Sequence, residues 1–525
     1  MDPARSTELL ARLADDLRRA GYTVDALERL WGAEAAEALH RGERVPARRV
    51  LDARRGEHGA SAPLAALAEL FVLGLPVPVA EVAEALSTLG VDGAAELGLV
   101  RESGGRVSAA LDLRPYAFVD ERGAVEWWIL SDLGELALGH ALGEHHVLGV
   151  GGASTTLSGL MLPTPARRVL DLGTGCGIQA MHASRFADEV VATDISERAL
   201  VLAGLNLRLN GIEGVELRLG SLFDPVAGER FDRIVSNPPF VITPRTEGVP
   251  EYDYRDGGMV GDALVEAVVR GAAEHLEPGG VAQLLANWEY RGDADGLERA
   301  AAWADGLDHW FVEREVQAVA EYAETWIRDG GTRQGTPEFD RLYDAWLDDF
   351  EARGVDHVGF GYVLLRRSDD GGASSATPTS GSTPLARVER RHGAIGSNPA
   401  GLGGHLARSL AAHDLLAHLD EGALRALMLT VAADVTEERH HWPGAEQPTV
   451  ILLRQGGGFG RAVDAGTALA AFVGAADGEL PAGVISDAIA HLLEVDPAEL
   501  WAELAPQLRE LVVGGLLVPV VDEVA

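Results

Sequence analysis

The chain has 525 residues, of which 47% are hydrophobic and 24% charged, proportions typical of a globular protein and not of a disordered or fibrous one. At roughly 100–200 residues per domain, this length predicts three or four domains. The 81 acidic and 44 basic residues leave a formal charge of -37, and every basic residue is an arginine. This balance argues against a protein that coats a phosphate backbone, because such proteins need a basic face.

The single cysteine, Cys176, excludes disulfides within the chain and a cysteine-based zinc site. The N-terminal segment is charged and helical in pattern, without the apolar core of a secretory signal. The most apolar stretches, Leu70–Ala80 and Leu511–Val521, are about half the ~20 residues that a membrane helix needs. We therefore expect a soluble, cytoplasmic protein that does not insert into membranes.

Residues 1–144 are expected to form a helical domain that includes a winged-helix-like module. Apolar residues have helical spacing in Ala65–Leu73 and Val79–Leu86. Two extended runs then flank Gly104-Gly105, a pair typical of a β-hairpin turn. Upstream, Arg41–Arg55 holds six arginines against two acids and forms a basic patch, which is either a solvated helix face or a contact for RNA.

Residues 145–368 alternate between β-rich apolar runs and helical segments, which predicts an α/β domain with a parallel sheet covered on both faces. A ligand then binds beyond the carboxyl ends of the strands. The expected strands are Arg168–Leu172, Val190–Thr193, Val215–Leu219, Arg233–Ser236, Val281–Ala286 and Gly359–Arg367. The expected helices are Ile178–Phe186, Glu197–Leu209 and Ala263–Leu276.

Residues 369–390 are expected to be a flexible linker, because Ser368–Thr383 is rich in Gly, Ser, Thr and Pro. Residues 391–525 then form an acidic α+β domain. Its helical runs at Ala465–Val473, Ala482–Leu493 and Ala498–Val512, followed by an apolar stretch, predict a second winged-helix-like module. Such modules contact nucleic acid or protein, and the acidic balance favours protein.

Three glycines at alternate positions, Gly173, Gly175 and Gly177, separate the strand that ends near Asp171 from the next helix. Glycines there let the backbone turn sharply and approach a ligand closely. The dinucleotide fingerprint requires a glycine where Ile178 stands, and a P-loop requires a lysine, so NAD and ATP are disfavoured.

This loop resembles the first motif of class I S-adenosylmethionine-dependent methyltransferases, whose fold is a Rossmann-like sheet of seven strands. The resemblance implies S-adenosylmethionine as cofactor, with Asp171 near its ammonium group and the three glycines around its methionine half. Asp194, after the next strand, matches the acid that accepts hydrogen bonds from both ribose hydroxyls. Ser221 stands where many relatives have an Asp for the adenine amino group, so its adenine contact lacks a charge.

The fourth strand runs into Asn237-Pro238-Pro239-Phe240, which resembles the motif of amino-methylating members of the family. These include adenine- and guanine-amino methyltransferases of DNA and ribosomal RNA, and HemK-like enzymes that methylate a release-factor glutamine amide. A planar NH2 group is a poor nucleophile because its lone pair is delocalised. We expect the Asn237 oxygen and the Pro238 carbonyl to accept its two hydrogens, on a backbone stiffened by proline. Phe240 is expected to stack on the flat substrate group.

Further along, Tyr254, Arg255 and Asp256 lie in a stretch that resembles the loop after this motif in HemK-like enzymes, and we expect them to line the substrate entrance with Pro239. Gly149–Met161 is expected to cover the cofactor from the other side. No metal is expected, because the paired histidines His145-His146 and His440-His441 have no evident third ligand.

These motifs predict methyl transfer from S-adenosylmethionine to a planar nitrogen. The acceptor stays open between a nucleic-acid base, with RNA favoured over DNA, and a glutamine amide of a translation protein such as a release factor or a ribosome-associated protein. The motif and the Arg41–Arg55 patch favour the base slightly, whereas the overall charge and the HemK-like loop after the motif favour the amide. A small-molecule amine ranks third. A cofactor-sensing, DNA-binding regulator is the non-enzymatic alternative, but it would have no use for an intact Asn237–Phe240.

Overall fold

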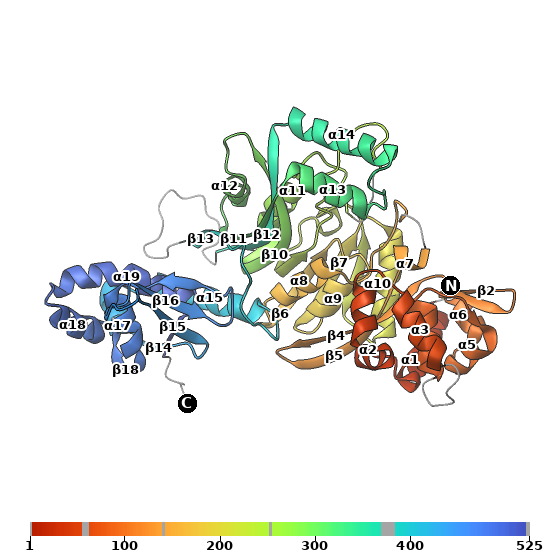
Figure 1. Cartoon of the computed structure of the whole chain (residues 1–525), viewed down its shortest axis with the longest axis horizontal. Coiled ribbons are helices and arrows are strands. Elements are labelled where there is room, and N and C mark those ends of the chain that lie inside the picture. The colour runs from red at the N-terminus through yellow and green to blue at the C-terminus, as the bar shows by residue number, and fades with distance from the viewer. Residues whose placement is uncertain (1–2, 55–61, 139–141, 251–254, 369–383, 521–525) are drawn as a thin grey trace. The chain divides into compact units, whose positions relative to one another are not determined.

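In the computed structural model of the chain, residues 3–54, 62–138, 142–250, 255–368 and 384–520 are described (Figure 1). The chain forms two compact units, one made of Met1–Ser158 and Pro165–Asp369 and the other of Gly159–Thr164 and Asp370–Ala525. The expected boundary between residues 144 and 145 therefore lies inside the first unit. Among the described residues, none of the helices combines the length and apolar character that crossing a membrane requires.

The first unit contains a sheet whose strands lie in the order β11-β12-β10-β9-β6-β7-β8. Strands β6 to β10 are parallel, and β12 runs antiparallel to both of its neighbours. This confirms the α/β, Rossmann-like sheet that the sequence predicts. The bounds are β6 Ala166–Leu172, β7 Ala187–Asp194, β8 Val215–Leu219, β9 Phe231–Ser236, β10 Leu276–Arg291, β11 Asp308–Ala318 and β12 Val355–Arg366.

Helices connect the parallel strands, because each such connection has to cross over the sheet. Helices α9 and α10 pack against β6, β7 and β8, and α11 and α12 pack against β10. The predicted bounds of β8 and α10 are confirmed residue for residue, whereas α9 ends three residues before the predicted Phe186. The bounds are α9 Ile178–Ala183, α10 Glu197–Leu209, η2 Asp224–Val226, α11 Ala263–His275, α12 Gly296–Ala301 and η3 Ala302–Ala304.

Two helices that the sequence analysis did not predict, α13 Val319–Asp329 and α14 Pro337–Ala352, are inserted between β11 and β12 (Figure 1). Their apolar faces share a buried core with Val241 and Ile242, which follow β9. The insertion therefore supports the chain segment that leaves the carboxyl end of the fourth strand.

The N-terminal region begins with three helices and continues with a small helical module that ends in a hairpin. Gly104 and Gly105 have φ values of 59° and 75°, as a two-residue hairpin turn between β2 and β3 requires. The three strands lie in the order β1-β3-β2. The bounds are α1 Pro3–Ala20, α2 Val24–His40, α3 Val45–Arg54, α4 Ala62–Leu67, η1 Ala68–Val72, β1 Val77–Pro78, α5 Val79–Ala85, α6 Gly90–Glu96, β2 Val100–Ser103 and β3 Arg106–Ala109.

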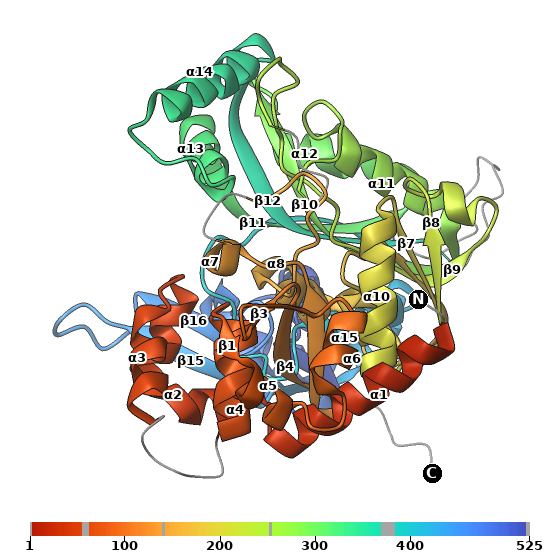
Figure 2. The ribbon, with the colours of Figure 1, turned by 90° about the vertical axis from the view of Figure 1, so that its right-hand side faces the viewer.

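A long hairpin of β4 Asp112–Asp120 and β5 Gly123–Ser131 joins this region to the sheet, followed by the short α7 Glu135–Leu138. The Asn206 amide on α10 exchanges two hydrogen bonds with the Leu130 backbone, at 2.7 and 2.9 Å. Helix α1 lies alongside α10 (Figure 2), and the two contribute to one hydrophobic core. The N-terminal region and the sheet thus fold as one body.

The second unit combines helices with small antiparallel sheets. Residues 369–383 of the expected linker lie outside the described residues, but Ala386–Arg390 forms strand β13, so this part of the linker prediction is corrected. The three predicted helices are present as α17, α18 and α19, and small sheets have the orders β18-β14-β19 and β15-β16-β17. The bounds are α15 Gly403–Ala417, α16 Glu421–Ala426, β14 Met428–Val431, β15 Val435–His440, β16 Val450–Gln455, β17 Ala462–Asp464, α17 Thr467–Ala475, β18 Asp477–Pro481, α18 Ala482–Leu493, α19 Pro497–Val513 and β19 Leu517–Pro519.

A buried histidine, His182, lies at the contact between the hairpin and the sheet domain. His182 of α9 packs against the rings of Phe118 and Trp127, and its Nε2 lies 3.0 Å from the Tyr116 hydroxyl. Burial lowers the pKa of His182 to about 3, against about 6.5 in an unfolded chain. Between these values only the unfolded state takes up the proton, so stability falls as the pH falls.

We predict that His182→Phe, which keeps an aromatic ring but cannot be protonated, flattens this dependence. Below pH 6.5, the free energy of unfolding of the wild type should fall by up to ~1.4 kcal/mol per pH unit relative to the variant. Urea unfolding of both proteins at pH values about one unit apart, from ~7.5 down to ~4.5, measures this difference in unfolding free energy. Parallel pH profiles for the two proteins would contradict it.

Candidate active site

A cavity of about 500 Å³ lies at the carboxyl ends of β6, β7 and β9, the edge of the sheet that the topology predicts. It is lined by the loop that leads into α8 (Gly152–Leu160), by the glycine loop, by the ends of β7 and β8 and by the segment after β9. The lining residues are His145–Gly149, Gly151–Ser154, Leu172–Cys176, Ile178, Gln179, Thr193–Ser196, Ala199, Gly220–Leu222, Ser236–Pro239, Asp256–Met259, Leu264 and Val268.

The glycine loop depends on left-handed backbone. Gly173, Gly175 and Gly177 have φ values of 78°, 56° and 89°, which side chains other than glycine rarely allow. Beside Gly173 and Gly175, which line the cavity, a Cβ atom would meet nothing within 4 Å. At Gly177 it would come 3.0 Å from the Ala203 Cβ, so this glycine allows the loop to pack closely on α10.

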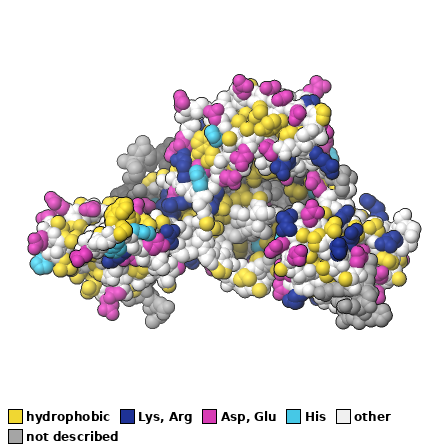
Figure 3. Space-filling view, in the orientation of Figure 1, with side chains coloured by type: hydrophobic (Ala, Val, Ile, Leu, Met, Phe, Trp, Pro, Cys, Tyr) yellow, Lys and Arg dark blue, Asp and Glu magenta, His cyan; other side chains and the backbone are white. Residues whose placement is uncertain are grey.

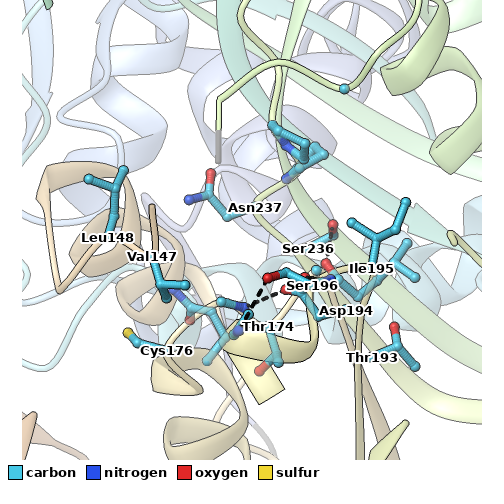
Figure 4. Close-up of a pocket in the computed structure, with 18 of the residues that line it drawn as sticks. Val147, Leu148, Thr174, Cys176, Thr193, Asp194, Ile195, Ser196, Ser236 and Asn237 are labelled. Atoms are coloured by element: carbon cyan, nitrogen blue, oxygen red, sulfur yellow. Dashed lines mark hydrogen bonds between the residues drawn. The ribbon is translucent and has the colours of Figure 1, made fainter. Parts of the chain in front are cut away.

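Asp194, the last residue of β7, lines the cavity and anchors the loops on both sides of it (Figure 4). One carboxylate oxygen accepts a hydrogen bond from the Gly175 N–H at 2.9 Å, and the other accepts one from the Ser196 N–H at 2.8 Å. Each carboxylate oxygen can accept more than one hydrogen bond. Asp194 therefore keeps acceptor capacity for hydroxyl groups of a bound ligand.

Asp171 lies beneath the loop, fully buried, and is not among the lining residues. Its Oδ2 accepts a hydrogen bond from the Thr174 hydroxyl at 2.5 Å, while its Oδ1 has no hydrogen-bond partner among the described residues. Burial raises the pKa of Asp171 to about 7. A cation bound close to the loop would favour the ionised carboxylate.

Asn237 follows β9, and its side chain projects into the cavity (Figure 4). Its Oδ1 is buried and has no hydrogen-bond partner among the described residues. The preceding Ser236 hydroxyl donates to the Leu172 carbonyl at 2.8 Å, which ties the end of β9 to the end of β6. Pro238 and Pro239 complete this wall. Asn237 thus lies at the joined ends of β9 and β6 with a side-chain oxygen that no described residue bonds.

Two predicted substrate residues lie outside the cavity lining. The ring of Phe240 packs edge-on against Phe360 of β12, with centroids 6.4 Å apart. The side chain of Arg255 is 7% exposed and donates to the Asp329 carboxylate at 3.0 Å. Both side chains therefore pack against neighbouring elements of the fold.

Of the other residues predicted to line the substrate entrance, the structure describes Asp256 but not Tyr254. Asp256 does line the cavity, and its buried carboxylate pairs with Arg245 and accepts from the Gly258 N–H at 3.0 Å. Tyr254 lies outside the described residues. Asp256 therefore positions the glycine-rich turn beside the cavity.

Several lining residues were not predicted. Ile195, 67% exposed, and Leu148, 45% exposed, place apolar side chains at the cavity, and Ile195 directly follows the predicted Asp194. Leu222, next to the predicted Ser221, has a φ of 46°, unusual for a leucine and often found where function constrains the backbone. The start of Gly149–Met161, predicted as a cover, does line the cavity together with His145 and His146.

His145 and His146, one of the two histidine pairs considered for metal binding, line the cavity. Burial lowers the pKa of His146. Within the described ranges there is no group of three or more His, Cys, Asp or Glu side chains placed to hold a metal ion.

Comparison with known proteins gives two family matches. Residues 19–110 match a family described as a domain of unknown function, and residues 150–298 match the methyltransferase small domain. The second match spans the glycine loop, Asp194 and the Asn237–Phe240 segment.

Curated relatives include both kinds of acceptor. The chain is 37% identical over 173 residues to the ribosomal protein uL3 glutamine methyltransferase of Bradyrhizobium diazoefficiens, covering 31% of this chain and 50% of that protein. It is 38% identical to the release factor glutamine methyltransferase of Gloeobacter violaceus, over 22% of this chain and 44% of that protein. It is 29% identical to the ribosomal RNA small subunit methyltransferase C of Salmonella newport, over 31% of this chain and 43% of that protein.

The chain spans about half the length of the curated relatives it matches. The matched residues 150–298 contain strands β6 to β10, the glycine loop and most of the residues that line the cavity. Residues 150–298 belong to the methyltransferase small-domain family, and the chain therefore carries a class I S-adenosylmethionine-dependent methyltransferase domain.

Proposed function

We propose that this protein transfers a methyl group from S-adenosylmethionine to a planar amino group, and that the acceptor is a side-chain amide of a protein. The observation that carries the proposal is the buried Oδ1 of Asn237, an acceptor without a partner among the described residues. An unsatisfied buried acceptor costs about 1–3 kcal/mol, so its natural complement is an N–H from the substrate.

The cofactor fits the residues at the ends of β6 and β7. Gly173 and Gly175 leave open space beside the backbone, and Asp194 offers carboxylate lone pairs to ribose hydroxyls. Asp171 lies close enough to the loop for a cofactor ammonium to favour its charged form, and Ser221 lines the cavity beyond β8. When bound, S-adenosylmethionine supplies a methyl group on a positively charged sulfur.

On the acceptor side, Asn237 and Pro238 provide the two oxygens for the hydrogens of an NH2 group, which leaves the nitrogen lone pair free to attack. Pro238 and Pro239 stiffen this segment, so that the oxygens are in place before the substrate binds. A neutral asparagine suits an amide or amino group that loses its proton to water after the methyl group has been transferred, so no general base is required.

The charge of the cavity favours a protein amide over a nucleic-acid base. No arginine is found among the lining residues in the described part of the chain, whereas Asp194 is; the second lining carboxylate, Asp256, is paired with Arg245. In the Arg41–Arg55 patch, Arg44 is taken up by the carbonyls of Leu73 and Leu136, at 2.9 and 3.0 Å. On the face in Figure 3, basic and acidic side chains are interspersed. These features reverse the slight preference for RNA drawn from the motif.

A nucleic-acid base remains the second candidate, because exposed Arg48 and Arg49 and a relative named as a ribosomal RNA methyltransferase favour it.

The helix–strand–helix–helix–hairpin order of Ala62–Ala109 supports a winged-helix-like module that docks the acceptor, for which we favour a protein surface. A pure cofactor sensor has no need for the oxygen of Asn237.

Asn237→Ala should lower the turnover rate by more than about a hundredfold, because an aligned acceptor for the amino hydrogens is lost. The assay is transfer of a labelled methyl group from S-adenosylmethionine into extract from cells that lack the gene. Asn237→Asp keeps an acceptor oxygen and is the matched control, with measurable rate expected. Cofactor affinity, measured by calorimetry, should be unchanged in both. Wild-type turnover in Asn237→Ala would refute the catalytic role.

Asp194→Ala should weaken cofactor binding by about 1–3 kcal/mol, because hydrogen bonds to a charged group are lost. The control is Asp188→Ala, an exposed acid near the other end of the same strand. Calorimetric titration of each variant with S-adenosylmethionine measures the effect. Equal affinity in wild type and Asp194→Ala would show that the ribose is held by other groups.

A further inference from the structure

We propose that Asn287 and Tyr322 are positioning residues that hold the Asn237–Phe240 segment in its reactive geometry. The proposal rests on the methyl-transfer function proposed above. Neither residue belongs to the cavity lining, so each acts through the backbone of this segment and of the residues that follow it.

Asn287 lies on β10, the strand next to β9, and its side chain is fully buried. Its Nδ2 donates a hydrogen bond of 2.6 Å to the carbonyl of Phe240. This bond fixes the end of the segment, three residues after Asn237. A hydrophobic side chain at this position would fill the space but would leave the Phe240 carbonyl without this donor.

Tyr322 of α13 holds the next part of the chain. Its hydroxyl accepts a hydrogen bond of 2.8 Å from the Ile242 N–H, and the residue is fully buried. Its ring stacks on Phe360 at 5.7 Å and 25°, and Phe360 in turn contacts the ring of Phe240. The hydroxyl and the ring of Tyr322 thus fix the same segment from one side.

The segment is stiff, and this makes distant anchors effective. Pro238 and Pro239 restrict the backbone between Asn237 and Phe240, so a shift at Phe240 is passed to Asn237 instead of being absorbed by rotation in between. A displacement of about 1 Å in a catalytic group can cost a hundredfold in rate. Two buried side chains with hydrogen bonds to Phe240 and Ile242 restrain such a shift.

Helix α13, which carries Tyr322, also contacts the segment after β9 through Arg255. The Val241 N–H donates to the Arg255 carbonyl at 2.7 Å, and the Arg255 side chain donates to the Trp326 carbonyl and to Asp329, at the end of α13. The inserted helices α13 and α14 therefore support both the segment after β9 and the loop that carries Asp256.

The test compares Asn287→Ala and Tyr322→Phe with Tyr343→Phe. The last variant removes a hydroxyl from the same pair of helices, but this hydroxyl donates to the Ala320 carbonyl at 3.2 Å and not to the segment after Asn237. Three quantities are measured on the full chain. They are the rate of labelled methyl transfer into the extract, the calorimetric affinity for S-adenosylmethionine, and hydrogen–deuterium exchange in peptides covering Ser236–Val249 and Val169–Ala180.

We expect the rate to fall about tenfold to a hundredfold in Asn287→Ala and Tyr322→Phe, with unchanged cofactor affinity. Exchange should become faster in Ser236–Val249 and stay the same in Val169–Ala180. Tyr343→Phe should resemble the wild type in all three. Full rate in both anchor variants, or an equal loss in Tyr343→Phe, would overturn the proposal.

Failure of the proposed function gives a different result. If the wild type transfers no methyl group, the function is wrong, yet exchange still tests the anchors without an acceptor. Unchanged exchange in Ser236–Val249 in both anchor variants would then overturn their role. If Asn287→Ala fails to fold, Tyr322→Phe, which removes one oxygen atom and keeps the ring, decides the question.

Discussion

The proposed site depends on one buried acceptor oxygen, the Oδ1 of Asn237, which has no hydrogen-bond partner among the described residues. Leaving a buried acceptor unsatisfied costs stability, and several contacts restrain the chain on both sides of Asn237. Prolines follow it directly, the Ser236 hydroxyl ties its strand to the neighbouring Leu172, and Asn287 holds the carbonyl of Phe240. The fold thereby keeps an oxygen available for a donor from outside the described chain.

The sheet brings this oxygen together with the glycine loop. Strand β6 pairs with β7 on one side and with β9 on the other, all parallel, so the glycine loop, Asp194 and Asn237 emerge from one edge. Parallel strands make this arrangement general for ligand sites in α/β folds. The segment before α8 also contributes, because Val147 and Leu148 lie across the cavity from Thr193 and Ile195 (Figure 4).

The parts that sequence reasoning predicted are those determined by local pattern. The alternation of apolar strands and helices predicts the sheet. The spacing of Gly173, Gly175 and Gly177, all with left-handed backbone, predicts the loop at the end of β6. The parts it missed depend on distant residues. The ring of Phe240 was expected to stack on the substrate; it packs edge-on against Phe360, far along the chain, a contact that no local pattern reveals. Arg255 turns to α13, which was not predicted at all. The left-handed backbone of Leu222 has no sequence signal.

The most direct test of the central claim is the chemical nature of the methylated product. After wild-type protein has transferred labelled methyl groups into extract from cells lacking the gene, the labelled material is treated with ribonuclease or protease and then hydrolysed in strong acid. An N-methylated amide breaks at its carbonyl–nitrogen bond and releases labelled methylamine. The account predicts label that is sensitive to protease, resists ribonuclease and is recovered as methylamine. Label that is lost with ribonuclease and recovered on a nucleobase would contradict it.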